Sequence, residues 1–323
     1  MEKKRITLII NPKSGTISKK GIESWLPAKI ERLGYLVDVR HTTGPGDATR
    51  IAADCARRGD YGVLACGGDG TVNEVAAGLI GTDTAMGILP AGSGNGLARH
   101  IGIPVDISLS LKVLAQDNIQ ECDYGTVNGR PFFCTFGLGF DAAVSHRFSE
   151  KARRGLNSYV ASALDEFVKY RSANYEITVG DEIITDRAFL VAVCNASQYG
   201  NNAFIAPAAS INDGYLDVTI VHDGNILEKA WMGVEMLTGS IGNHGKIRVF
   251  RTSSLKIKCR EQTAAHLDGE PTEFMGEAEI KCIPGKLKIF VPRQKIYFIP
   301  ILTPLWYTIR EWGVIISRPF RRH

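Results

Sequence analysis

The stretch that most constrains the fold spans residues 61–74 and reads YGVLACGGDGTVNE. Residues 61–66 form a short apolar run of the length and composition of a buried parallel strand. The run stops at Gly67-Gly68-Asp69-Gly70, and the pattern indicates a helix from Thr71, a candidate N-cap. Glycines at a strand-to-helix turn let backbone N–H groups approach an anion, and the helix N-terminus favours negative charge. The stretch therefore predicts a phosphate-binding loop at the carboxyl end of a strand.

A tight turn without any ligand is the competing interpretation of these glycines. Asp69, which stands between them, favours a ligand site. A carboxylate beside a phosphate is repulsive unless it holds a metal ion, a ribose hydroxyl or a reacting proton. The loop is therefore predicted to take part in binding or chemistry.

Three further loops of small and polar residues follow predicted strands. The strands 5–10, 35–40 and 85–89 lead into loops 11–15, 42–46 and 91–96, and helices are predicted over 22–33, 48–58, 72–79 and 97–100. This alternation predicts an α/β domain with a doubly wound, mostly parallel sheet. Because all four loops follow strands, they share one edge, where we expect a nucleotide crevice. None of them matches the GxxxxGKS/T or GxGxxG pattern, so neither a P-loop protein nor a dinucleotide dehydrogenase is favoured.

The pattern changes near residue 120. Asn128-Gly129 predicts a hairpin between a strand from Asp123 and a return over 131–140, and an amphipathic helix is predicted over 156–170. Short alternating strands then dominate, with one helical stretch near 226–238; the strands cover 175–179, 187–194, 215–221, 247–251, 255–260, 276–282 and 286–291. We therefore expect a nucleotide-binding domain over 1–125, a β-sandwich over 126–294 and a C-terminal segment over 295–323.

Composition narrows the class of protein. The 323 residues are 44% hydrophobic and 22% charged, which is typical of a folded globular chain. The net charge of +4 is too small to indicate nucleic-acid binding but fits phosphate ligands or an anionic membrane surface. Seven cysteines without metal-ligand spacing indicate reduced core residues in a cytoplasmic protein. The first apolar run ends at Asn11-Pro12, and no run reaches about 18 apolar residues, so neither a signal peptide nor a transmembrane helix is expected.

For two segments, one aromatic and one basic, the sequence does not decide what they contact. On one helical face the C-terminal segment places a stripe of large apolar residues: Leu305, Trp306, Ile309, Trp312 and Ile316. Such a helix suits a membrane interface, and it suits equally well a cover over an apolar face of the protein. The cluster Lys151, Arg153 and Arg154 either meets anionic headgroups or is a solvated helix start.

Four motifs together resemble the diacylglycerol kinase and sphingosine kinase family of lipid kinases. They are NPKSG, GGDGTVNE, LPAGSGN and the late triplet Asp268-Gly269-Glu270, and they occur in the family's order over residues 5 to about 292. The resemblance implies an α/β nucleotide-binding domain, a β-sandwich domain and an active site between them. It implies that ATP phosphorylates a hydroxyl of a membrane lipid and that the protein associates peripherally with an anionic membrane. The oligomeric state is left open, with a homodimer as one option.

Motif by motif, the resemblance implies an ATP site and its cofactors. Backbone N–H groups of 67–71 would take the phosphates, and Asn73 would orient the loop. Mg²⁺ on the phosphates would find carboxylates among Asp69, Asp123 and Glu270. The implied ATP-site residues are Asn11, Pro12, Lys13, Ser14, Gly15, Thr43, Gly67, Gly68, Asp69, Gly70, Thr71, Val72, Asn73 and Ser93.

The proton acceptor and a second metal site follow from the same resemblance. Asp268 or Glu270 matches the base motif and Asp69 is the weaker choice, while an Asp-Gly hairpin turn is the plain alternative. A structural Mg²⁺ is implied at Asp213, with carbonyls of Ser210 and Tyr215, although an Asn-Asp-Gly turn explains these residues equally well.

Two alternatives and one departure stay open. Asn95-Gly96 stands where bacterial diacylglycerol kinases often have Asn-Asp, so the lipid is left open between diacylglycerol and a sphingoid or ceramide lipid. An NAD kinase shares a GGDG loop on a similar fold. A catalytically silent lipid-binding protein on this scaffold would have lost a carboxylate, yet Asp69, Asp123, Asp268 and Glu270 are all present.

Overall fold

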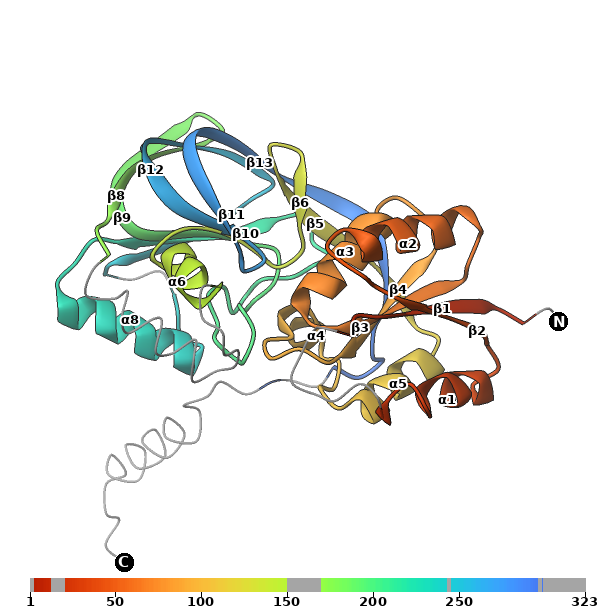
Figure 1. Cartoon of the computed structure of the whole chain (residues 1–323). Coiled ribbons are helices and arrows are strands. Elements are labelled where there is room, and N and C mark those ends of the chain that lie inside the picture. Colours follow the sequence, from red (N-terminus) through yellow and green to blue (C-terminus); the bar gives the residue numbers. More distant parts are fainter. Residues whose placement is uncertain (1–2, 13–20, 150–169, 243–244, 296–297, 299–323) are drawn as a thin grey trace, which may run out of the picture.

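The computed structural model describes residues 3–12, 21–149, 170–242, 245–295 and 298, and it shows two lobes side by side (Figure 1). Lys13, Ser14 and Gly15, the helix expected over 156–170 except for Tyr170, the cluster at 151–154 and nearly all of 295–323 lie outside these residues. No helix within the described ranges is long and apolar enough to cross a membrane.

The first lobe is a parallel sheet between helices. Its strands pair in the order β2-β1-β3-β4, every pair parallel. Helices α2 and α3 cover one face, and α1 and α5 cover the other (Figure 1). This confirms the doubly wound α/β fold. The elements are β1 (Arg5–Ile10), α1 (Leu26–Arg32), β2 (Leu36–His41), α2 (Asp47–Arg57), β3 (Gly62–Gly67), α3 (Asp69–Leu79), β4 (Ala85–Pro90), α4 (Gly96–Ile101) and α5 (Ile107–Ala115).

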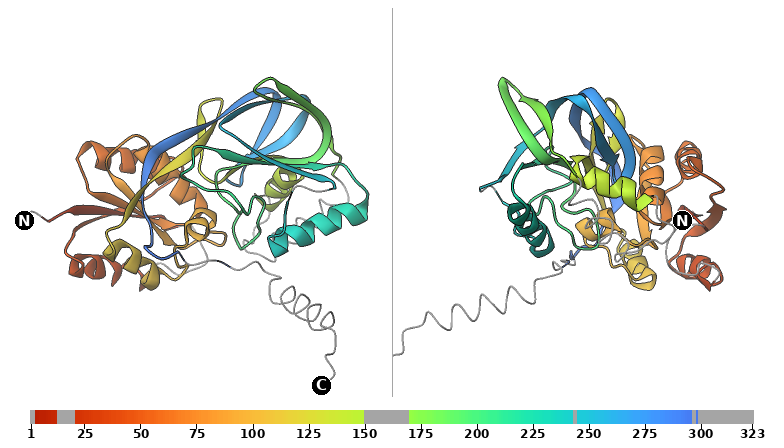
Figure 2. Two further views of the ribbon diagram at one scale, coloured as in Figure 1. Left: turned by 180° about the vertical axis from the view of Figure 1, so that it is seen from behind. Right: turned by 60° about the vertical axis from the view of Figure 1, so that its left-hand side comes forward.

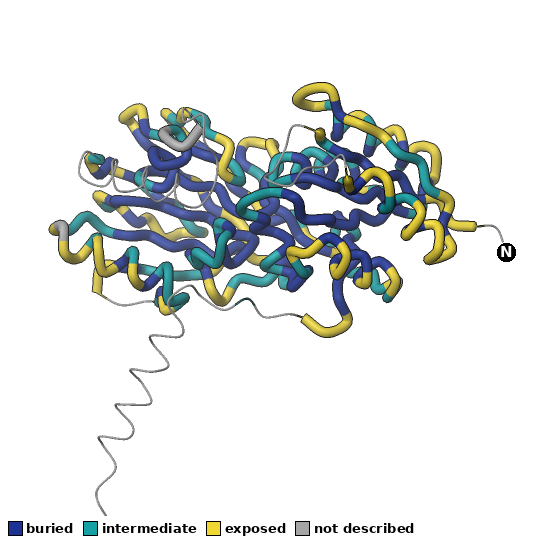
Figure 3. The backbone as a smooth tube through the Cα atoms, turned by 60° about the horizontal axis from the view of Figure 1, so that its bottom comes forward, coloured by how far each residue is buried: buried dark blue, intermediate teal, exposed yellow. Residues whose placement is uncertain are grey.

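The core of this lobe explains why the alternation could be read from the sequence. Every residue of β3 and β4 is buried, as expected for inner strands with helices on both faces. The buried residues of α2 and of α3 recur at helical spacing. The two helices pack closely at Gly78, where a Cβ would lie 2.4 Å from the Thr49 carbonyl oxygen. Buried residues follow the strands of both lobes, and exposed residues gather in loops and on outer helices (Figure 3).

The second lobe is built mainly of antiparallel strands. Asn128 and Gly129, with φ of 49° and 81°, form the predicted hairpin turn between β5 and β6. The elements are β5 (Ile119–Val127), β6 (Arg130–Phe132), β7 (Thr135–Gly139), α6 (Phe140–Ser149), β8 (Ala173–Val179), β9 (Glu182–Cys194), β10 (Leu216–His222), α8 (Ile226–Thr238), β11 (Ile247–Thr252), β12 (Ser254–Leu267) and β13 (Glu270–Phe290).

Two long strands fold this sheet back on itself. The first half of β9 pairs with β8 and its second half with β7, and β12 likewise pairs with both β8 and β7. A register shift between Cys259 and Thr263 marks the bend in β12. The layers enclose an apolar core that includes Phe136, Tyr175 and Ile257. The β-sandwich prediction is therefore confirmed.

Strand β13 joins the two lobes. The sequence predicted separate strands over 276–282 and 286–291, but the structure has one strand that passes Pro284-Gly285 with a register shift. β13 pairs with β12 and β5, and its end pairs with β4 of the first lobe. Leu287, Ile289 and Phe290 belong to the core of the first lobe. The two lobes thus share β5 and β13, which run from one lobe into the other (Figure 2).

Candidate active site

The GGDG motif lies where β3 passes into α3. The helix begins at Asp69, with Gly68 as an extended N-cap, so the prediction of Thr71 as cap and 72 as helix start is wrong. Gly68 has no side chain to cap the helix, and the first N–H groups of any helix lack partners within it. A Cβ on Gly67 would lie 2.4 Å from the Thr71 hydroxyl oxygen, which explains that glycine. The turn is therefore suited to an anion, as predicted.

Asn11 ties the first loop to this turn. Its side-chain Nδ2 donates to the Thr71 hydroxyl at 3.1 Å, and its backbone N–H donates to the Cys66 carbonyl at 3.2 Å. Thr71 and Val72 are buried, and Asn73 is half-buried in the same helix. The structure therefore brings the described residues of the first and third predicted loops together.

Asp69 turns toward the next loop. Its Oδ2 accepts the N–H of Asn95 at 2.9 Å, and its Oδ1 accepts the N–H of Gly96 at 2.7 Å. Burial raises the pKa of Asp69 above its ordinary value, against the lowering effect of these N–H groups. The carboxylate therefore joins the GGDG turn to the start of α4 and fixes the spacing of the two loops.

Asn95, which was not among the predicted site residues, organises the fourth loop, residues 91–96. It has a left-handed φ of 52°, its Oδ1 accepts the N–H of Gly92, and its Nδ2 donates to the Gly92 carbonyl. Gly92 crosses Gly68 so closely that a Cβ on Gly92 would lie 2.5 Å from the Gly68 Cα. Ser93 is half-buried in this loop. The signal available in the sequence was an Asn, which tolerates left-handed φ, at the end of a glycine-rich loop.

The second loop is held by Glu74 of the GGDGTVNE motif, another residue whose role was missed. Its two carboxylate oxygens accept the N–H groups of Gly46 and Ala48 at 2.9 and 3.0 Å, so it caps α2 from a different helix. Thr43 donates its N–H and its hydroxyl to Asp47, and these bonds hold the pKa of Asp47 well below its usual range. Thr43 itself is exposed.

The triplet 268–270 forms the turn between β12 and β13. Asp268 and Gly269 have φ of 51° and 81°, so the plain hairpin interpretation holds for the backbone. The Asp268 carboxylate nevertheless leaves the turn, and it accepts the N–H groups of Phe133, Cys134 and Thr135 at 2.7–2.9 Å. Burial raises its pKa to about 6 although these N–H groups favour the charged form. Asp268 is therefore poised to change charge near neutral pH.

Glu270 connects this turn to the GGDG motif. A Cβ on Gly70 would lie 3.4 Å from Oε1 of Glu270, so the carboxylate lies beside the first turn of α3. Gly70 belongs to the first lobe and Glu270 to the hairpin of the second. The structure thus brings together two motifs that are separated by about two thirds of the chain.

A buried network lies behind the 268–270 turn. His266 Nδ1 accepts the N–H of Gly269 at 3.2 Å, so its Nε2 carries the proton toward Asp141 Oδ2, 3.2 Å away. The Tyr199 hydroxyl donates to the same oxygen at 2.6 Å. Nothing near Asp141 or Tyr199 in the sequence pointed to this arrangement, because the three residues lie on separate elements.

The segment after β9 holds the second lobe against the fourth loop, residues 91–96. The N–H of Asn201 donates to the Gly94 carbonyl at 3.1 Å, and a Cβ on Gly200 would lie 2.9 Å from Gly94. Arg99 donates from Nε to the Gly94 carbonyl and from Nη1 to Asn202. These contacts hold the loop of residues 91–96 against the second lobe.

The predicted metal residues have other partners. Asp123 accepts the N–H groups of Gly214 and Gly285 at 2.7 and 2.8 Å, and it lines an open pocket of about 650 Å³ together with Asp213. Asp213 accepts the N–H of Tyr215, and its other oxygen lies 3.3 Å from an Arg251 guanidinium nitrogen. Ser210 donates its hydroxyl to Asn212. In the described part of the chain, no three His, Cys, Asp or Glu side chains gather into a group suited to a metal ion.

Arg251 decides how well a cation fits at Asp213. Its Nε also binds Asp217 at 3.0 Å, so one guanidinium already neutralises two carboxylates there. A metal ion at Asp213 would compete with this fixed positive charge. Arg251 therefore already balances the charge of Asp213, and the structural Mg²⁺ at Asp213 stays a prediction from the resemblance.

Comparison with known proteins agrees with both lobes. Residues 5–127 match the diacylglycerol kinase catalytic domain, and residues 135–291 match the YegS C-terminal NAD kinase beta sandwich-like domain. The chain is 31% identical to a Bacillus subtilis protein named diacylglycerol kinase, over 90% of this chain and 98% of that protein. It is 30% identical to a Salmonella arizonae protein named "Probable lipid kinase YegS", over 80% and 87% of the two chains.

Solved structures share the fold. A diacylglycerol kinase structure from Bacillus anthracis matches with a TM-score of 0.72 at 21% identity, over 91% of this chain and 98% of that one. An NAD kinase from Archaeoglobus fulgidus in complex with ATP matches with a TM-score of 0.51 at 12% identity, over 95% and 98%. Given the motifs, their meeting between the lobes and these matches, the chain belongs to the diacylglycerol kinase family of lipid kinases and is a kinase that phosphorylates an alcohol group.

Proposed function

We propose that this protein transfers the γ-phosphate of ATP, with Mg²⁺, to a hydroxyl of a membrane lipid, either diacylglycerol or a sphingoid or ceramide lipid. The observation that carries the proposal is the position of Glu270 beside Gly70. It places the acidic turn of the second lobe at the helix end suited to phosphate. A donor phosphate and an acceptor hydroxyl could meet there. We further propose that the protein acts in the cytoplasm, at an anionic membrane surface.

The nucleotide side of the mechanism needs positioning and charge neutralisation more than covalent chemistry. N–H groups of residues 67–71 would bind phosphate oxygens, and Asp69 and Asn95 would keep the two glycine loops at a fixed spacing. Mg²⁺ neutralises charge on the phosphates when it is bound. Glu270 is the exposed carboxylate beside α3 and would contact that ion, which would enter with ATP.

The acceptor side needs a proton acceptor. The lipid hydroxyl oxygen forms a bond to the γ-phosphorus, the bond to the bridging oxygen of ADP breaks, and the hydroxyl proton passes to Asp268. Oδ1 of Asp268 accepts two N–H groups, whereas Oδ2 accepts only one. Oδ2 therefore keeps a lone pair that could receive the proton. A pKa of about 6 makes Asp268 charged at neutral pH, as a general base requires. Asp69 is disfavoured as base because each of its oxygens holds the other loop.

An NAD kinase is the second candidate, and the likeness to an ATP-bound NAD kinase of 12% identity supports the fold alone. A silent lipid-binding protein is the third. The test is to incubate the protein with labelled ATP, Mg²⁺ and mixed micelles of diacylglycerol, sphingosine, ceramide and monoacylglycerol, with NAD in a parallel tube. We expect label in one lipid. Label only in NAD, or ATP bound without any labelled product, would overturn the proposal.

A further inference from the structure

Helix α8 carries an apolar face on its outer side. Leu227 and Trp231 are 77% and 61% exposed, Val234 is 38% exposed, and Ala230 is exposed between them. Their spacing of i, i+3, i+4 and i+7 places the four side chains on one face of the helix. We call these four residues the α8 face. Helix α8 lies along the outer edge of the second lobe (Figure 1).

Two of the three charged residues of α8 are largely buried, and the third, Glu228, is exposed in the first turn. Lys229 has only 15% of its side chain exposed, pairs with Asp223 at 2.9 Å, and lies 4.6 Å from the centre of the Phe189 ring. Glu235 is buried and accepts the Trp231 indole N–H at 3.1 Å. The inner side of α8 is apolar as well, because Met232 is buried in the core of the second lobe and Met236 packs against it. A helix that faces water carries its apolar residues on the inner side alone, so the exposed α8 face is apolar surface that the fold of the lobe does not use.

The helix does not need a partner to stay folded. The Asn225 side chain and Glu228 form a capping box at its start, and Gly239 ends it with a left-handed φ of 65°. Caps of this kind stabilise a helix from within the chain. The α8 face is thus a preformed surface.

The inner side of α8 leads toward the candidate active site. Lys229 covers Phe189, whose ring stacks on Phe140 at 4.5 Å. The next residue, Asp141, binds His266 behind the 268–270 turn. A chain of contacts thus runs from the inner side of α8 through Phe189 and Phe140 to the network behind the 268–270 turn.

We propose that the α8 face inserts shallowly into a lipid bilayer and seats the second lobe on the membrane. The idea that the protein meets a bilayer rests on the proposed function. Tryptophan with its N–H bonded is suited to the bilayer interface. The α8 face has four residues, whereas a stable protein interface uses roughly 20–30 residues on each partner. The Lys229–Asp223 pair leaves no excess positive charge, so binding should depend on apolar contact and little on salt.

The test is flotation of the full chain with phosphatidylcholine vesicles at low and high salt. We expect the wild type to float at both salt concentrations. The variant L227Q/W231Q should partition roughly tenfold or more weakly, because two large apolar side chains leave the acyl boundary. Its ATP binding and its Tm should match the wild type.

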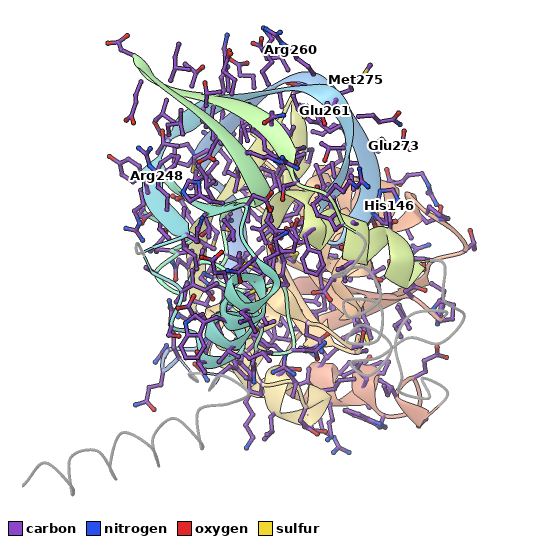
Figure 4. All side chains as sticks on the ribbon, turned by 90° about the vertical axis from the view of Figure 1, so that its left-hand side faces the viewer. His146, Arg248, Arg260, Glu261, Glu273 and Met275 are labelled. Carbon is purple, nitrogen blue, oxygen red and sulfur yellow. The ribbon has the colours of Figure 1, made fainter. Side chains whose placement is uncertain are left out.

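A matched control variant replaces two apolar side chains of similar exposed fraction elsewhere on the second lobe. Ile183 and Met275 are 63% and 69% exposed, in β9 and β13, and Met275 lies at the far end of the lobe from α8 (Figure 4). The variant I183Q/M275Q should float like the wild type. Equal loss in both variants would overturn the proposal, and so would failure of the wild type to float. A change in oligomeric state of L227Q/W231Q, with flotation retained, would assign the face to a second copy and overturn it as well.

The proposed function and this inference can fail separately. If the protein floats through α8 but phosphorylates no lipid, the kinase proposal fails and the membrane surface stands. If it phosphorylates a lipid in detergent micelles but L227Q/W231Q floats like the wild type, the kinase proposal stands and the membrane surface is refuted. The ratio of activity on vesicles to activity on micelles should fall in L227Q/W231Q and stay constant in I183Q/M275Q.

Discussion

The phosphate side and the acceptor side of the candidate site are each held by an aspartate that accepts backbone N–H groups, but the donors lie at different distances in the chain. On the phosphate side, Asp69 accepts N–H groups from residues 26 and 27 positions away, within one lobe. On the acceptor side, Asp268 accepts N–H groups from residues 133 to 135 positions away, across the second lobe. The phosphate side can therefore form with the first lobe. The acceptor side requires β7, β12 and β13 to pair first.

The largest expected effect comes from the acceptor side. Asp268→Asn keeps the shape of the side chain but removes the proton acceptor, so kcat should fall by roughly 10²–10⁴. ATP affinity should stay within about twofold, because the phosphate loops are untouched. The measurements are kcat and the Kd for ATP. Glu273→Gln, an exposed change in the same hairpin (Figure 4), is the control. Retained turnover in Asp268→Asn would move the base elsewhere.

The next largest effect is expected from a substitution on the phosphate side. Asp69→Ala leaves the N–H groups of Asn95 and Gly96 without their acceptor, which should cost about 1–3 kcal/mol of unfolding free energy. Because the spacing of the two glycine loops is lost, ATP affinity and kcat should both fall, each by about tenfold or more. Calorimetry gives the Kd, and urea unfolding gives the stability. If only kcat fell and ATP binding persisted, Asp69 would take part in chemistry and the contrast with Asp268 would fail.

The pH dependence sharpens the comparison. The pKa of Asp268 is raised to about 6, so the carboxylate is charged above that pH and protonated below it. Activity that needs the charged base should rise with pH through about 6, and it should be about tenfold lower at pH 5 than at pH 7. The measurement is kcat/KM across pH 4.5–8. The residual activity of Asp268→Asn should lack this limb. A limb that persists unchanged in the variant would belong to another group.

The smallest expected effect tests the contact between Gly70 on the phosphate side and Glu270 on the acceptor side. Gly70→Ala would bring a Cβ within 3.4 Å of Glu270 Oε1, and a flexible carboxylate can give way by a few tenths of an ångström. We expect kcat to fall a few-fold (roughly two- to fivefold), with unfolding free energy changed by less than about 1 kcal/mol. Gly242→Ala, where a Cβ would meet only the Ser240 carbonyl at 3.9 Å, is the control. Equal kinetics in both variants would show that Glu270 does not act beside Gly70.

The sequence predicted the first lobe well because its signals are local. β1, β3 and β4 are largely buried apolar runs that end in small residues, β2 is a more exposed edge strand, and each helix that follows has its own period. The error at the start of α3 was local too: Thr71 looked like a cap, but the glycines allow the helix to begin at Asp69. In the second lobe the strands were found, but β13 was split at Pro284-Gly285, where the structure keeps pairing through a bulge.

The site was predicted as motifs and not as geometry. The GGDG residues, Ser93, Asp268 and Glu270 were named from their types and order, while the roles of Asn95, Glu74 and the His266–Asp141–Tyr199 network were missed. Asp123 was assigned to the phosphate-bound metal, whereas its carboxylate is held by N–H groups of Gly214 and Gly285. Such partners lie far apart in the chain, and no local pattern encodes them.

By itself the sequence determined the order of strands and helices, the glycine loops and the acidic triplet, because backbone propensity and hydrophobic period act over a few residues. The tertiary structure decided which of these groups meet. The pairing of β13 with β12, β5 and β4 places Glu270 beside Gly70 and buries Asp268 among backbone N–H groups. Burial then raises the pKa of that carboxyl, because a charge loses solvation when the chain folds around it.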